Sequence, residues 1–525
     1  MTPWRATRRG LPWLLFAVQS IACGRPGVGG AGATLRLALI NDPIMNPVLA
    51  SELGSILINK VIFPGLLRPD SAGKPAPDLA LSWEITPDQR RYTFHLRPNV
   101  VWHDGTPFRA EDVKFTFDQI LDPKSGSLLW SDFSVIDQVE VADSLTVRFE
   151  LKAPFAPFLT LLGHNAGIAP AHAFTGRAML DATDFNRTKP IGTGPFQVSS
   201  AVSGSSITLS ANPRYYGPAP KLARVVFKIV PSQNAQVAQL RAGELDLVTI
   251  EPGQLAQLAG DSSVKVSQVS VPQHYYVGFN QQLPLFKPAV LRRALGMAVD
   301  RQALIDGVLK GSADFPTGTI PRASQGFFAD ELPPLQYDTT KALALFAEAG
   351  WRRGSGGRLQ NAKGEPLRLT LLVDKGNPTR EQAAVAIQQD FKRVGVDLTI
   401  RAMEFASMVR DYIQTKRYEA YLIWWNTPSD PDQYGYYGTG QANNDVSYSN
   451  RRADSLLRAG RATNDVAARK RAYAAFQALE LEDPPVLVLF YPREIQARSA
   501  RLRGVPPLGI RDALRWVEQF ELAPE

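Results

Sequence analysis

The amino-acid sequence predicts an α/β protein with two or three structural lobes. A chain of 525 residues is too long to fold around a single hydrophobic core. Its composition, 44% hydrophobic and 21% charged, is that of an ordinary globular protein. Between residues 368 and 426, strand patterns alternate with helix patterns, and this order predicts parallel strands joined by helices.

Three strands and two helices are predicted in that alternating region. The strands are 368–374, 398–403 and 418–426, and the helices are 378–394 and 405–416. Ligands of parallel sheets bind beyond the carboxyl ends of the strands. The third strand ends in Trp424-Trp425-Asn426 and then breaks into polar turn residues. Two indoles and an amide suit a ligand-binding wall, and a buried hydrophobic wedge is the alternative interpretation.

Further elements are predicted on both sides of this region. Residues 34–40 alternate as a strand, and 289–309 form one long helix. A helix over 234–242 stops at Gly243. The other predicted elements are strands 224–230, 245–250 and 485–491 and helices 449–461 and 466–481.

The N-terminus has the pattern of a secretory signal. Arg5, Arg8 and Arg9 precede a short apolar run over 11–22, which is too short to span a membrane. Small residues then precede the lone Cys23, and this arrangement resembles a bacterial lipobox. We expect residues 1–23 to be the signal, with Cys23 as a lipidated mature N-terminus, and 24–33 to be a flexible tether. The alternative is a plain signal peptide with an incidental cysteine.

Charge and histidine spacing exclude several classes of function. The net charge of +8 comes from basic residues that are scattered beside acids, so no nucleic-acid-binding stripe is predicted. The histidines lie too far apart for a metal site. They are His95, His103, His164, His172 and His274. The chain has no Gly-x-Ser-x-Gly elbow and no second thiol, so no catalytic residue, metal or cofactor is predicted.

A run of short motifs identifies the family that the chain resembles. Residues 79–84 read LALSWE, 92–98 read YTFHLRP, 101–108 read VWHDGTPF and 110–115 read AEDVKF. By themselves these predict two strands, an Asp-Gly turn and a helix. In this order they resemble the signature of the family 5 extracellular solute-binding proteins, the peptide/nickel class that serves bacterial ABC importers. Arg109 departs from the usual helix-capping Thr.

The resemblance extends over about residues 34–520. Residues 190–196, PIGTGPF, resemble the turn between lobes in this family, and 274–280, HYYVGFN, resemble the strand that enters the second large lobe. The resemblance implies a type II, cluster C periplasmic-binding-protein-like architecture with an extra small lobe. It places lobe I at 34–54, 188–271 and 486–525, the small lobe at 55–187, and lobe II at 272–485, with 485–491 as the return crossing.

The resemblance also implies a set of ligand-binding residues. We expect Trp424, Trp425 and Asn426 to form a cleft wall, with one of the two indoles facing the ligand because neighbouring strand residues point to opposite faces. Peptide-binding members carry an Asp, which pairs with the peptide ammonium, where this chain has Thr427. Asp430 is interpreted as a turn cap. The other expected contacts are Lys375 for a ligand carboxylate, Asn280, and Tyr434 with its neighbours Tyr436 and Tyr437.

The expected function is ligand capture for an importer. The chain would be a monomeric, lipid-anchored receptor in the periplasm or on the outer face of the cell membrane. It would deliver a small peptide or peptide-like solute to the permease of an ABC importer. Two alternatives are an exported ligand-binding sensor or chaperone, and an exported hydrolase. A hydrolase of this kind needs a paired acid and base at short range, which the sequence does not show.

Overall fold

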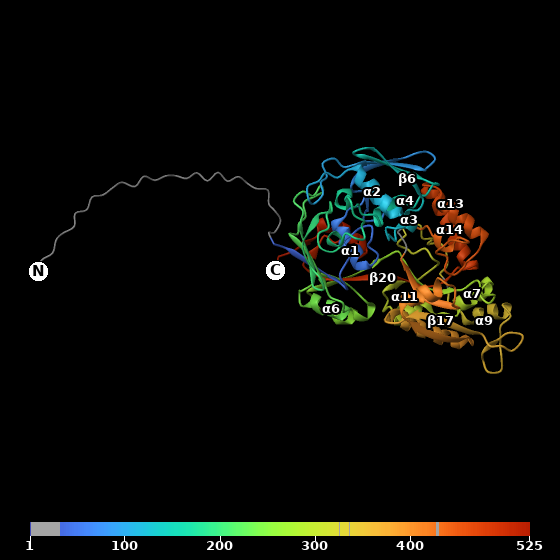
Figure 1. Ribbon diagram of the computed structural model, residues 1–525. Helices are drawn as coiled ribbons and strands as arrows, with labels where there is room; N and C mark the ends of the chain where they lie inside the picture. Colours follow the sequence, from blue (N-terminus) through green and yellow to red (C-terminus); the bar gives the residue numbers. More distant parts are fainter. Residues whose placement is uncertain (2–31, 325, 335, 427–429, 525) are drawn as a thin grey trace.

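The computed structural model describes Met1 and residues 32–524, except 325, 335 and 427–429 (Figure 1). Apart from Met1, the predicted signal over 1–23 with Cys23 lies outside the described residues, as do most of the predicted tether and Thr427. Among those that are described, no helix combines the length and the apolarity that crossing a bilayer requires.

A large mixed sheet runs through the whole molecule. Its ten strands in line lie in the order β18-β17-β19-β13-β20-β11-β1-β10-β9-β8, with β12 and β14 paired to β20 beside this line. The strands, in that order, are Asp397–Met403, Arg368–Asp374, Ala420–Asn426, Gln273–Phe279, Leu487–Ser499, Leu247–Ile250, Thr34–Leu39, Arg224–Ile229, Ser206–Ala211 and Phe196–Val202, then Val264–Ser270 and Ala313–Asp314.

Strand β20 joins the two halves of this sheet. Its first residues pair with β13 in an antiparallel register, for example Phe490 with Tyr275. Its last residues pair with β11 and β12, for example Ala497 with Val248 and with Val266. The strand predicted over 485–491 is present from Leu487 and continues to Ser499, so one unbroken segment pairs with both halves (Figure 1).

The predicted βαβαβ order is confirmed. Strand β17 pairs parallel with both β18 and β19, and α10 (Pro378–Val394) forms the first connection. The second connection begins as α11 (Phe405–Met408) and continues as a π-helical turn over Val409–Ile413. Strand β13 then pairs antiparallel with β19, so the sheet is mixed rather than purely parallel.

The buried side chains on the two faces of β17 and β19 belong to different cores. Leu371, Val373 and Leu422 pack with helix α10 and with α7 (Ala289–Met297) and α9 (Thr339–Glu348). Leu372 and Ile423 belong to a second core. That core includes side chains from α13 (Arg451–Arg461) and α14 (Val466–Glu482). Helices on both faces are the normal arrangement for strands with long apolar runs.

The single long helix predicted over 289–309 is wrong. Two helices are present, α7 and α8 (Arg301–Gly307), with a break before Asp300. The Asp300 carboxylate accepts the backbone N–H of Ala303 at 2.9 Å, which caps the start of α8. The backbone N–H of Asp300 donates to Asp390 at 3.0 Å instead of continuing the first helix.

The motif-rich N-terminal part forms a second, four-stranded sheet. Its order is β4 (Ala80–Ile85), β5 (Arg91–Leu96), β7 (Thr146–Leu151) and β6 (Ile136–Asp143), and α2 (Ala110–Leu121) packs on it. Asp112 accepts hydrogen bonds from the Arg109 backbone at 3.0 Å and from the Trp102 indole at 3.1 Å. The carboxylate within the helix therefore holds its first turn, although Arg109 makes no side-chain cap.

His103 links this part to the Gly-Thr-Gly-Pro turn. Its ring Nδ1 accepts the backbone N–H of Gly192 at 3.1 Å, and its Nε2 lies 3.1 Å from the Gly194 carbonyl. Burial lowers the pKa of His103 to about 4, so the imidazole is neutral at neutral pH. The histidine of the signature thus has a structural role, in which both ring nitrogens contact the backbone of the turn.

Buried apolar side chains from residues 35 to 227 and from 502 to 520 form one continuous core. This shared core packs lobe I and the small lobe together as one body. The lobe boundaries predicted from the sequence stay a proposal. Lobe II carries its own two cores.

Gly194 lies against the end of α1 (Leu53–Ile62). A Cβ at this position would lie 2.2 Å from the Val61 carbonyl oxygen and 2.7 Å from that of Ile62, so backbone would have to move. We expect Gly194→Ala to lower the free energy of unfolding by about 1–3 kcal/mol, as overpacking does. Urea unfolding measures this, and Gly253→Ala, where a Cβ meets nothing within 4 Å, is the control. Equal stabilities of the two variants would refute the close approach.

Candidate functional site

A cleft of about 790 Å³ lies between lobe II and the body formed by lobe I and the small lobe. This volume is within the range of small-molecule and short-peptide sites. The middle of strand β20, from Pro492 to Ile495, forms part of its lining. The carboxyl end of β19 contributes Trp424 and Asn426, as the topology of the parallel strands predicts.

The lobe II side of the cleft is uncharged and carries aromatic rings. Trp424 is 37% exposed, which is unusual for an indole, and it lines the cavity with Tyr275 and Tyr436. Asn426 and Asn377 add amide groups at the same edge. The side-chain Oδ1 of Asn377 caps α10 by accepting the Arg380 backbone N–H at 2.9 Å. This side therefore offers ring faces and a few neutral hydrogen-bonding groups.

The opposite side is charged, and most of its charges are already paired. Arg493 forms an ion pair with Asp314. Glu494 accepts the backbone N–H of Ile510 at 2.7 Å, and burial raises its pKa. Asp512 faces the His164 Nδ1 at 3.1 Å. Burial raises the pKa of this carboxyl, but the hydrogen bond with His164 and the nearby Lys60 and Arg511 outweigh it and hold the pKa below its usual range.

Arg511 lines the same side and differs from these residues. Its side chain is half-buried, and no hydrogen bond or ion pair of its guanidinium is found among the described residues. Arg511 lies close enough to Asp512 to act on its charge, but a guanidinium whose N–H groups are not engaged by a carboxylate can bind an anion.

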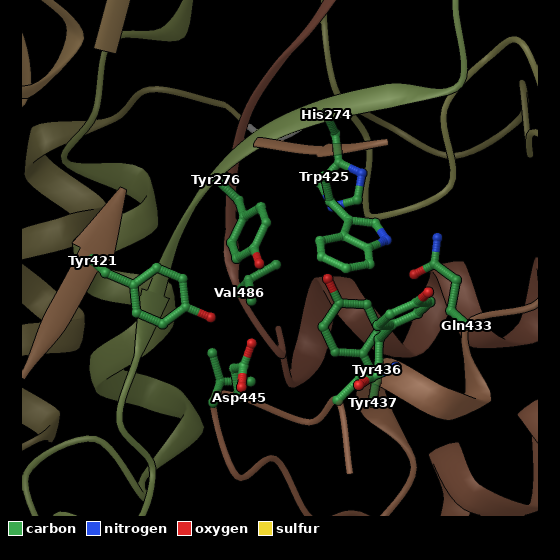
Figure 2. Close-up of a pocket in the computed structure, with 11 residues that line it drawn as sticks. His274, Tyr276, Tyr421, Trp425, Gln433, Tyr436, Tyr437, Asp445 and Val486 are labelled. Carbon is green, nitrogen blue, oxygen red and sulfur yellow. The ribbon is translucent and has the colours of Figure 1, made fainter. Parts of the chain in front are cut away.

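Trp425 does not share the cleft with Trp424. The pleat of β19 turns it to the other face, where its ring lies 4.7 Å from that of Tyr436. Figure 2 shows the indole among His274, Tyr276, Gln433 and Tyr436. The cavity they enclose is about 20 Å³, which is room for roughly one or two water molecules and for no peptide side chain. Trp425 thus supports the cleft wall from behind.

His274 lies in this small cavity with both ring nitrogens buried and without a hydrogen-bond partner in the described part of the chain. Burial alone lowers its pKa to about 3. The imidazole is therefore neutral in the folded protein and acts as a flat packing surface beside Tyr276, whose ring centroid lies 5.3 Å away.

The remaining predicted site residues lie away from the cleft lining. Asn280 is 2% exposed, and its amide donates to the carbonyls of Lys416 and Tyr418 at 3.0 Å each. The Lys375 side chain is exposed and is not among the described residues that line the cleft. The ring of Tyr434 is covered by the guanidinium of Arg461, whose carbon lies 5.0 Å from the ring centroid.

Asp430 has the structural role expected of it. It is 2% exposed, accepts the Asp432 N–H at 3.0 Å and pairs with Arg469 at 2.6 Å. The sequence reasoning missed Arg511, Asp512 and His164. These residues are far apart in sequence and belong to no motif, so only their proximity in the fold marks them.

Polar contacts also connect the two sides of the cleft. Thr379 Oγ1 of lobe II donates to Glu251 of lobe I at 3.3 Å, and both residues line the cleft. Away from the cleft lining, Ala156 N–H donates to the Arg461 carbonyl at 2.8 Å, and Asn464 N–H donates to Gln89 at 2.7 Å.

The described residues contain no group of three or more His, Cys, Asp and Glu side chains arranged to hold a metal ion. The carboxylates on the charged side are hydrogen-bonded to backbone or to His164, as given above. The arrangement is suited to non-covalent binding of a solute by ring faces, amides and charges.

Comparison with known proteins gives a consistent result. A family model described as bacterial extracellular solute-binding proteins, family 5 Middle, matches residues 74–446. The oligopeptide-binding protein AppA of Bacillus subtilis is 28% identical over 493 residues, covering 92% of this chain and 90% of AppA. The probable D,D-dipeptide-binding periplasmic protein DdpA of Escherichia coli is 30% identical over 435 residues, 81% of each chain.

Solved structures agree over nearly the full length. AppA from Bacillus subtilis in complex with a nonapeptide superposes with a TM-score of 0.79 and 27% identity, covering 94% of this chain and 100% of AppA. NikZ from Campylobacter jejuni in complex with Ni(L-His) gives a TM-score of 0.79 and 26% identity, covering 93% and 99%.

The buried neutral His274 predicts a loss of stability in acid. Its pKa is about 3 in the folded protein and near 6.5 in the unfolded chain, so only the unfolded chain binds this proton between those values. The free energy of unfolding should therefore fall as pH drops from 6.5 towards 3, by up to about 1.4 kcal/mol per pH unit from this residue.

The variant His274→Phe should remove the contribution of this residue to the pH dependence of the free energy of unfolding. Urea unfolding between pH 7 and pH 4 measures it, and His103 contributes a second proton that remains in the variant. Val486→Ala alters the wall of the same cavity without removing the imidazole and is the control. An unchanged slope in His274→Phe would rule out this account.

Proposed function

Because the chain belongs to the bacterial extracellular solute-binding proteins of family 5, we propose that it captures a small peptide or peptide-like solute for an ABC importer. The solute binds in the cleft between the lobes, and the loaded protein, a monomer, delivers it to the transmembrane subunits of the permease. The relatives named above, an oligopeptide-binding protein and a probable D,D-dipeptide-binding protein, support this class of ligand.

The two-sided lining of the cleft is the observation that carries the proposal. The large cavity has an aromatic side with Trp424 and a charged side with Arg511, and these belong to different lobes. A ligand that contacts both sides stabilises the closed arrangement in proportion to its preference for that state.

The chemistry of the lining suits a peptide-like ligand. The exposed indole of Trp424 and the ring of Tyr436 can pack on apolar or planar groups of the ligand. Asn426 can both donate to and accept from an amide. We propose that Trp424 and Asn426 contact the ligand directly, while Trp425 positions the strand. Thr427 replaces the acidic anchor expected for a free ammonium, so a blocked or otherwise altered amino end is favoured. For Lys375, Asn280 and Tyr434, the ligand contacts expected from the resemblance stay predictions.

We also propose that the protein is exported and anchored by a lipid on Cys23. The basic residues, the short apolar run and the small residues before the cysteine support this. A tethered receptor would remain close to its permease, which raises the local concentration of loaded protein at the transporter.

Protein purified under native conditions should carry a small peptide or peptide-like compound. Mass spectrometry of the denatured protein would identify it, and calorimetry would then measure its affinity. We expect Trp424→Ala to weaken that affinity by about 10-fold or more, because burying an aromatic side chain against a ligand contributes about 1.5–3 kcal/mol.

The control for this experiment is Val466→Ala, an exposed apolar residue on α14 that does not line the cleft. Equal affinities of Trp424→Ala and the parent protein would exclude Trp424 from the site. Recovery of ordinary free-amine dipeptides at high occupancy would contradict the hypothesis that Thr427 disfavours a free ammonium. If the purified protein chemically converted the recovered compound, the receptor hypothesis would be rejected in favour of an enzyme.

Lipidation predicts a clear change on removing the thiol. In a bacterial host, Cys23→Ser should abolish incorporation of labelled palmitate and move the protein from the membrane fraction to the soluble fraction. Ser20→Leu, which introduces the residue usual at the start of the motif, should retain both label and membrane association. Unlabelled parent protein in the soluble fraction would show that Cys23 is incidental.

A further inference from the structure

A second, smaller pocket adjoins the cleft on its charged side. Its volume is about 60 Å³, and it shares Ile56, His164, Asn165 and Arg511 with the lining of the larger cavity. Helix α1 contributes Lys60, and the C-terminal segment contributes Arg511 and Arg515. The pocket therefore connects sequence-distant parts of the body formed by lobe I and the small lobe.

The lining of this pocket is strongly cationic. Lys60 is 7% exposed and Arg515 is 6% exposed, and Arg511 is half-buried. None of the described residues that line the pocket is an acid. Burying a charge is costly unless a counter-charge or hydrogen bonds offset the loss of water. Three cations at one small cavity therefore require an explanation.

The protein satisfies only part of these donors. Lys60 Nζ and Arg515 Nη2 both donate to the same carbonyl oxygen, that of His164, the latter at 3.2 Å. The Nε and Nη1 atoms of Arg515 are buried and have no hydrogen-bond partner among the described residues. Two nitrogens of this guanidinium, which together carry three N–H groups, thus lack a partner among the described residues, and Arg515 lines the pocket.

Nearby carboxylates do not fill this role. Asp512 is oriented towards His164 Nδ1 and lines the cleft rather than the pocket, and Asp132 accepts from Asn165 at 2.7 Å. Asp78 and Asp512 are close enough to favour the charged form of Arg515, yet burial still lowers the pKa of this guanidinium. Burial and the neighbouring Arg515 likewise lower the pKa of Lys60 well below its usual value. A bound anion would reverse both effects.

We propose that this pocket is a subsite for an oxyanion carried by the ligand, a carboxylate or a group of similar shape, which Arg515, Arg511 and Lys60 bind. The inference rests on the proposed function, because the group must arrive on a solute that lies in the cleft. The ligand class is thereby narrowed to solutes with an acidic end. The residues lie on lobe I and the small lobe, apart from Lys375 on lobe II.

The size of the pocket fits this assignment. A buried water needs roughly 10–15 Å³ by the same measure, so the pocket has room for about four waters or for one carboxylate with one or two waters. An aromatic or branched side chain is too large. Arg511 lines both the pocket and the cleft, so an acidic end can enter while the rest of the ligand lies against Trp424.

The test compares two forms of one N-terminally acetylated tripeptide library, with a free C-terminal carboxylate and with a C-terminal amide. The protein is first stripped of bound compounds by reversible unfolding, and retained peptides are quantified by native mass spectrometry. We expect the parent protein to retain the acid form about 10-fold or more over the amide, as a charge-assisted hydrogen bond implies. Arg515→Met and, independently, Arg511→Met should bring this ratio close to one.

Arg503→Met is the matched control, because Arg503 is exposed on β21 (Leu502–Arg503) and lines neither cavity. Its acid-to-amide ratio should equal that of the parent. Urea unfolding verifies that each variant folds. If either Arg511→Met or Arg515→Met fails to fold, the other variant still tests the subsite. A second readout is the anomalous signal of selenate soaked into crystals, expected in the pocket of the parent and absent in Arg515→Met.

The outcomes separate the subsite from the proposed function. Equal retention of acid and amide by the parent, or a ratio that neither variant changes, overturns the subsite while peptide capture stands. If the parent protein retains neither form, peptide capture is contradicted. The selenate experiment then shows whether the pocket binds an oxyanion. Selenate density that Arg515→Met removes supports an oxyanion site, and a pocket that contains water only overturns it.

Discussion

The crossing of strand β20 from lobe II into lobe I is the constraint on which the rest of the structure depends. Its first half is hydrogen-bonded to β13 and its second half to β11 and β12, so neither lobe is complete without it. The residues between these halves, Pro492 to Ile495, line the cleft. A continuous strand can bend between two sheets without losing its pairing in either, so the cleft can change its width while both lobes remain intact.

The two sides of the cleft divide the chemistry of recognition between them. Lobe II presents ring faces and amides, and its indole wall is supported by a nearly filled aromatic pocket around Trp425. The other body presents charges that are largely paired with one another, apart from Arg511 and the buried donors of Arg515. Under the proposed function, a solute has to satisfy both sides to hold them together, and this requirement is a physical source of selectivity.

The motifs that identify the family are mainly scaffold residues. Trp102 and Asp112 hold the start of α2, His103 binds the turn at Gly192 and Gly194, and that turn lies against α1. Such contacts are set by backbone geometry, which explains why the fold could be predicted from these residues. The ligand contacts form no comparable pattern, so the same motifs predicted the location of the cleft and only part of its lining.

The sequence by itself determined the alternating strands and helices from 368 to 426, and it placed Trp424 and Asn426 at a carboxyl edge. It determined that neighbouring indoles point to opposite faces, because a strand has a period of two. Only the tertiary structure decided which indole faces the cleft and that Asp300 breaks a helix. It also brought Lys60 and Arg515 to the same carbonyl of His164. Proximity between residues that are hundreds of positions apart depends on how whole lobes pack, and no local pattern encodes it.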